Sequence, residues 1–175
     1  MSEIVGKIDP TIPRKLGDLL VYGLIPTDLP SLRQPNGENS KGGKVGAHGM
    51  HAGHMILKYV DHPDVKLYIE DGIANGGDFF NTAITLDCRT AQIDTAIEIA
   101  QRLGYVADKV VDKTYPWFVD IETAAFLNDT CEVVWDVRKD GKVLCLRPAT
   151  TFGWILGAKF DPVFRAIVAP FLLAD

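Results

Sequence analysis

Cysteine is scarce in this chain of 175 residues, and its three copies, Cys88, Cys131 and Cys145, lie far apart. They form no CxxC pair, and their odd number argues against a disulfide framework and for a reducing compartment. We interpret all three as small core residues, because none has the local sequence of a nucleophile.

Long apolar runs are absent as well. No uninterrupted apolar stretch approaches the roughly 20 residues that a membrane helix needs. The residues after Met1, Ser-Glu-Ile-Val-Gly-Lys, lack the apolar core of a signal peptide. The sequence therefore predicts a soluble, cytoplasmic protein with no membrane partner.

The chain has no excess of positive charge, since its net charge is −5. Binding to phosphates depends on clustered Lys and Arg, whatever the total charge. Here the clusters are local: Lys41 with Lys44 in one loop, and Lys109 with Lys113 flanking another. The charge pattern thus neither excludes nor supports a nucleic-acid partner.

Apolar residues make up 47% of the chain and charged residues 23%, which is enough apolar surface for a packed core. The length fits one domain. Residues 1–17 contain two prolines and little periodicity, so we expect a flexible N-terminal arm followed by a single domain over residues 18–175.

Strands and helices are expected to alternate along this domain. The patterns predict strands at 18–25, 79–86, 105–111 and 150–156, and helices at 44–60, 62–72, 91–103 and 160–173. Two further strands, 131–137 and 143–146, flank Asp140-Gly141, a strong hairpin turn. We predict an α/β fold: a single, mostly buried, mixed four-stranded sheet with helices on both faces, plus a β-hairpin insertion at about 115–147.

The most unusual stretch runs from Lys41 to His51, Lys-Gly-Gly-Lys-Val-Gly-Ala-His-Gly-Met-His. Its lysines and glycines directly precede a predicted helix, whose first N–H groups favour an anion such as phosphate or a developing oxyanion. The spacing is not that of a Walker A loop. The alternative is a flexible polar loop with solvated lysines.

His48, His51 and His54 recur every three residues. A single helix does not direct all three toward one ion, and the HExxH spacing of catalytic zinc is absent. We therefore expect no metal and no other cofactor. A metal-dependent hydrolase using His48, His51 and Asp61 stays open as an alternative.

Two more groups stand at predicted strand ends. Asp112 follows the strand at 105–111, and carboxyl ends of strands are where open α/β sheets bind ligands. It would orient a lysine or polarise a water, or simply cap the next turn. Thr150 and Thr151 begin the last strand, where either hydroxyl would donate to an oxyanion or satisfy the backbone.

These residues together resemble the archaeal and eukaryotic class of peptidyl-tRNA hydrolases. The run Gly43-Lys44-x-x-x-His48-x-x-His51-Ala52 is similar to the family pattern Gly-Lys-x-x-x-Gln-x-x-His-Ala, with His48 in place of glutamine. Asp112 matches the family aspartate, whereas Pro116 stands where the family has threonine. The Asp-Lys-Thr-Tyr-Pro loop and the Ala-Thr-Thr-Phe-Gly ending look most like the divergent phage-encoded branch.

The resemblance implies hydrolysis of the ester bond of peptidyl-tRNA, which releases peptide and free tRNA, and it implies a homodimer. It implies the catalytic residues Lys44, His51, Asp112, Thr150 and Thr151, and the substrate-binding residues Lys41, Gly43, His48, Lys113 and Thr114. A catalytically inactive module that binds RNA or a protein on the same fold is the other alternative.

Overall fold

The first apolar run of the chain forms a central strand of the sheet. The computed structural model describes residues 15–29, 43–74, 83–127 and 131–173. In it, β1 (Leu19–Pro26) pairs in parallel with β2 (Ala83–Cys88) and antiparallel with β5 (Lys142–Ala158). Because β1 has a neighbour at each edge and helices on each face, an apolar run without polar alternation suits this position.

Five strands follow one another in the order β3-β5-β1-β2-β6, with β3 spanning Val106–Asp120 and β6 spanning Leu172–Leu173. The mixed α/β sheet is confirmed, but the prediction of four strands omitted the short edge strand β6. This strand lies within the range predicted as the last helix. That helix, α5 (Pro162–Val168), ends two residues before Pro170, which has no N–H to continue it.

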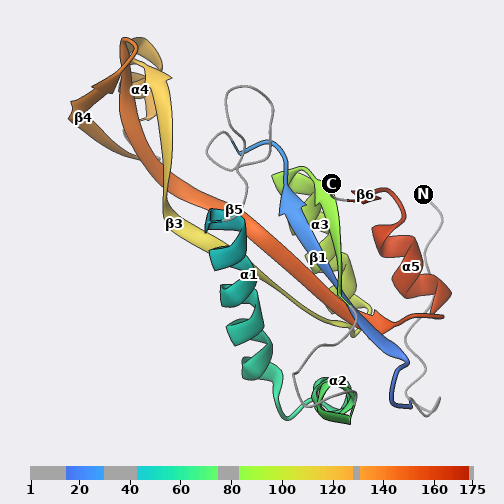
Figure 1. The fold of residues 1–175 in the computed structure, drawn as a ribbon. Helices are drawn as coiled ribbons and strands as arrows, with labels where there is room; N and C mark the ends of the chain where they lie inside the picture. Colours follow the sequence, from blue (N-terminus) through green and yellow to red (C-terminus); the bar gives the residue numbers. More distant parts are fainter. Residues whose placement is uncertain (1–14, 30–42, 75–82, 128–130, 174–175) are drawn as a thin grey trace.

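Helices cover both faces of the sheet, as predicted (Figure 1). On one face pack α1 (Gly43–Ile56), a 3-10 turn (Leu57–Tyr59) and α2 (Pro63–Ala74). The other face carries α3 (Thr90–Arg102) and α5. None of the helices in the described residues is long and apolar enough to cross a membrane.

Residues 115–127 and 131–147 form a projecting arm (Figure 1). The predicted hairpin is confirmed: β4 (Glu132–Lys139) turns into β5 through Asp140 and Gly141, whose φ angles are 52° and 77°. Two features of the arm were not predicted. The strand expected to end at residue 111 continues to Asp120, and a short helix, α4 (Ile121–Leu127), follows it.

The prediction that all three cysteines are small core residues is correct for Cys88 and Cys145, which are buried, whereas Cys131 is only half-buried. The expectation of no disulfide is wrong. Cys131 and Cys145 form a disulfide within the arm, with their Cα atoms 6.2 Å apart. The hairpin is the physical reason, because it sets Val133 opposite Cys145 and so brings Cys131 near. In the reduced pair, burial and the adjacent Cys131 raise the pKa of the Cys145 thiol to about 11.

Gly157 gives a stability prediction, because β5 packs directly against the Phe164 ring at this residue. A Cβ atom added to Gly157 would lie 2.5 Å from Phe164 Cδ2. Phe164 is fully buried, so the ring has little room to shift. We expect Gly157→Ala to lower the free energy of unfolding by about 1–3 kcal/mol, measured by urea denaturation.

The matched control is Gly53→Ala on the exposed surface of α1, where an added Cβ meets nothing within 4 Å. Alanine is the better helix former by about 1 kcal/mol, so this variant should be slightly more stable. Equal stability of Gly157→Ala and the unmodified protein would contradict the close packing of β5 on α5.

Candidate active site

The ladder between β3 and β5 is irregular where the core of the sheet passes into the arm. Val110 pairs with Phe152 and Val111 with Thr150, which leaves Thr151 as an extra residue on β5. A second irregularity follows between Asp112 and Tyr115. Such bulges bend a strand and re-aim its side chains, and Figure 1 shows β5 curving between core and arm.

This bend lies at the carboxyl edge of the parallel strands. Leu24 is paired with Gly153, so Thr151 and Thr150 come level with the end of β1. Asp112 lies beside them on β3, opposite Ala149. In α/β sheets the carboxyl edge of the strands is where ligands bind. The predicted residues Asp112, Thr150 and Thr151 are thus brought together at the expected kind of place.

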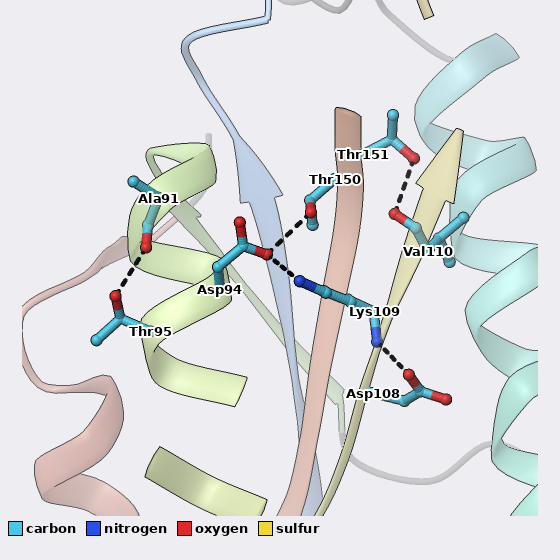
Figure 2. Close-up of polar contacts among 8 residues, drawn as sticks. All are labelled: Ala91, Asp94, Thr95, Asp108, Lys109, Val110, Thr150 and Thr151. Atoms are coloured by element: carbon cyan, nitrogen blue, oxygen red, sulfur yellow. Dashed lines mark hydrogen bonds and ion pairs between the residues drawn. The ribbon is translucent and has the colours of Figure 1, made fainter. Parts of the chain in front are cut away.

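Asp94, in α3, joins two elements at this edge (Figure 2). Its Oδ1 atom accepts a hydrogen bond of 2.9 Å from the Thr150 hydroxyl and lies 2.5 Å from Lys109 Nζ. The two charged side chains are 44% and 36% exposed, so this ion pair is open to solvent on one side. One carboxylate therefore holds both a cation and a hydroxyl in place.

Thr151 and Asp112 each have a local partner. The buried Thr151 hydroxyl donates to the Val110 carbonyl oxygen at 3.4 Å (Figure 2). Asp112 Oδ1 accepts from the backbone N–H of Thr114 at 2.9 Å and from its hydroxyl at 3.3 Å. Asp112 thus caps the following turn, which is one of the two roles predicted for it. A carboxylate has further acceptor sites, and these could still bind a ligand.

A groove of about 430 Å³ lies between α1 and β3. Its lining side chains and backbone come from His51, His54, Met55, Lys58, Lys109, Val110 and Val111. At its end Asp108 accepts a hydrogen bond of 3.2 Å from the Tyr59 hydroxyl and lies 3.6 Å from Lys58 Nζ. Burial, and then the charge of Asp108, raise the pKa of Tyr59. The groove therefore combines imidazole, ammonium and backbone groups beside the bend.

The other predicted site residues are located as follows. Gly43 and Lys44 are the first two residues of α1, but their side chains and that of His48 lie outside the described residues, as does Lys41 entirely. His51 is exposed on α1 at the groove. Lys113 is exposed in β3, and Thr114 makes the turn with Asp112.

Asp94 was missed at the sequence level. Asp94 stands beside Ile93 and Ile97, two buried apolar positions of α3. In the sequence, the only indication of a role was this acidic residue at the border of a packed helix face. Only the position of α3 on β5, where Gly153 faces Ile93, reveals which partners its carboxylate meets.

Cys88 lies at the same edge, at the end of β2, and its Sγ is 3.7 Å from the Ile25 carbonyl oxygen. Burial raises the pKa of its thiol to about 12, with smaller contributions from Asp87 and Asp28. The thiol is therefore protonated at neutral pH, which does not suit a nucleophile.

Among the described residues, no group of three His, Cys, Asp or Glu side chains is arranged to hold a metal ion. Asp61, one member of the metal alternative, lies two residues beyond the 3-10 turn and 4.0 Å from Lys66 Nζ. Comparison with known proteins found no matching family model and no matching curated protein.

Proposed function

We propose that this protein hydrolyses the ester bond that joins a peptide to the 3′ end of tRNA. One observation carries the proposal: Asp112, Thr150 and Thr151 occupy neighbouring positions of the paired strands β3 and β5 at the carboxyl edge of β1. The start of α1, formed by Gly43 and Lys44, lies toward the same end of the sheet (Figure 1). The order of these residues along the chain is also the one that the resemblance implies.

The proposed chemistry is attack of water on the ester carbonyl. The tetrahedral intermediate carries a negative oxygen, which an ammonium group stabilises. Lys44 has this role in the proposal, and Lys109 adds a second ammonium that Asp94 already orients. Collapse of the intermediate breaks the bond to the ribose oxygen, which takes up a proton and leaves as the 3′-hydroxyl of tRNA.

Asp112 and His51 handle the proton in this proposal. The Asp112 carboxylate uses Oδ1 for the turn with Thr114 and orients the attacking water with its remaining acceptor sites. His51, on the groove, carries a proton to the ribose oxygen. The Thr150 hydroxyl now donates its one proton to Asp94, and in this proposal it turns from that carboxylate to donate to the leaving oxygen.

The test is release of peptide from an N-blocked aminoacyl-tRNA by the purified protein. The matched control substrate carries an amide instead of the ester at the same 3′ position. We expect turnover of the ester and an intact amide, because water attacks an ester far more readily. No release of peptide from the ester at high protein concentration would refute the proposal.

Asp94 supplies a prediction of its own. We expect Asp94→Asn to lower kcat for ester cleavage about tenfold, because Lys109 and the Thr150 hydroxyl lose the carboxylate that orients them. KM should change little, and so should the thermal midpoint, since the ion pair is partly exposed.

The control for Asp94→Asn is Glu98→Gln, one turn further along α3, where Glu98 pairs with Arg102 on the surface. We expect no change in kcat for this variant. A loss of the same size in both variants would mean that the helix, and not the Asp94 carboxylate, accounts for the effect.

One observation favours a second candidate, an RNA-binding module without turnover. Asp112 Oδ1 is already used by two groups of Thr114, and Asp94 Oδ1 by Lys109 and Thr150. Filter binding distinguishes the two candidates: measurable tRNA affinity without any release of labelled peptide is the result that a binding module gives.

A further inference from the structure

The arm contains a three-stranded antiparallel sheet, in which the outer part of β5 lies between β3 and β4. Residues directly opposite each other across such strands point to the same face. Phe118, Leu144 and Val134 form one such row, and Trp117, Cys145 and Val133 form the next row on the other face. The register therefore assigns the paired side chains of the arm to one of two faces, whereas Trp135, Asp136 and Val137 fall in a register shift of β4 and are not assigned.

The face that carries Cys145 is packed. Val143, Cys145 and Tyr115 on this face are fully buried, and so is Ala124 of α4, which contacts both β3 and β5. The disulfide to Cys131 lies on the same side. This face is therefore buried, under α4 toward the tip and, at Tyr115, against Leu29 and Ala149 toward the body.

The opposite face, here called the open face, is apolar and partly exposed. Its centre is Phe118, which is 41% exposed, with half-buried Leu144 and Val134 in the same row. The next row toward the body adds half-buried Pro116 and Leu146. Five adjacent, partly exposed apolar side chains on one sheet face indicate an interaction surface.

Charges border the open face at its two ends. The row nearest the body ends in Glu132 on β4, and the row at the tip contains Asp120, Lys142 and Lys139. The base row therefore carries one negative charge and the tip row a net positive charge of one, from two lysines and one aspartate. Because its paired positions carry a single aromatic ring and no excess of cations, the open face does not suit nucleic acid, which needs basic residues along several phosphates.

We propose that the open face binds the open face of a second copy of this chain. In an antiparallel arrangement about a twofold axis that crosses the strands, the tip of each arm covers the base of the other. Glu132 on the β4 edge then meets Lys139 on the β4 edge of the other copy, twice by symmetry. The Phe118 rows meet at the centre.

The shape of the chain fits this arrangement. The arm projects from the body (Figure 1), so antiparallel arms overlap while the two bodies lie at opposite ends. A parallel arrangement would place the bodies side by side and bring Lys142 against its own symmetry copy. Among the paired residues, the antiparallel form brings opposite charges into contact and no like charges.

The experiment is sedimentation equilibrium of the full chain over a range of protein concentrations. We expect a monomer–dimer equilibrium whose Kd rises about tenfold or more in Phe118→Glu. Phe126→Ser is the matched control, because Phe126 lies on α4 and is 87% exposed. It should leave the Kd unchanged.

Charge reversal tests the arrangement itself. Glu132→Lys and Lys139→Glu should each raise the Kd, and the double variant should restore it toward the original value. A protein that stays monomeric, a Kd unaffected by Phe118→Glu, or a double variant weaker than both single ones would overturn the proposal. So would a monomer in which Phe118→Glu lowers tRNA affinity, since the face would then bind nucleic acid.

Discussion

Lys44→Ala should lower the rate of peptide release from peptidyl-tRNA about 100-fold or more. Removing one preorganised donor to a developing oxyanion typically has an effect of this order. Lys44 is the second residue of α1, and the N–H groups and dipole of a helix start favour the same negative charge. We expect kcat to fall and KM to stay nearly constant.

The matched control is Lys66→Ala, because Lys66 is exposed on α2, near Asp61 and away from the bend. Its rate should equal that of the unmodified protein. Asp112→Asn should behave like Lys44→Ala, since it retains the turn with Thr114 but loses the negative charge. Full turnover in both Lys44→Ala and Asp112→Asn would contradict the proposed roles.

Trp154→Ala should have the largest effect on stability. Trp154 is fully buried on β5, packs edge-on against Tyr59 with ring centroids 5.8 Å apart, and belongs to the core beneath α1 and α2. Truncating a buried Trp to Ala typically lowers the free energy of unfolding by about 3–5 kcal/mol. Urea denaturation followed by circular dichroism gives the value.

Trp154→Phe is the informative companion variant. Within the described part of the chain, the buried Nε1 of Trp154 has no hydrogen-bond acceptor. Phenylalanine keeps much of the ring and removes this unpaired N–H, which by itself costs about 1–3 kcal/mol. Trp154→Phe should therefore be much less destabilising than Trp154→Ala. Equal losses of unfolding free energy in the two variants would mean that the Trp154 N–H has a hydrogen-bond acceptor, or that the lost ring volume alone accounts for the destabilisation.

The parts of the fold set by local sequence were predictable. The apolar run of β1, the Asp140-Gly141 turn and the stop of α3 at Gly104, whose φ is 87°, each follow from the residues at that place. The extra length of β3 was not predictable, because a proline such as Pro116 argues against a strand when the sequence is considered without its partner strand. In the structure β3 pairs with β5 both before and after the irregularity between Asp112 and Tyr115, so the strand continues through Pro116.

The candidate site likewise contains residues that the sequence predicted and residues that it did not. Asp112, Thr150 and Thr151 were found because they flank predicted strands, and the sheet order then brings them together. The partnership of Asp94 with Lys109 joins residues on a helix and a strand, and only the packing of α3 on β5 decides it. The cysteine pair was missed for a similar reason, since its proximity depends on the register of β4 against β5.

The most direct test of the central proposal is a single-turnover reaction with peptidyl-tRNA in water enriched in ¹⁸O, with the protein in excess over substrate. We predict that one ¹⁸O atom enters the carboxylate of the released peptide and that the tRNA keeps an unlabelled 3′-hydroxyl. Substrate that is bound but stays intact, or ¹⁸O that appears in the tRNA, would contradict hydrolysis at the ester carbonyl.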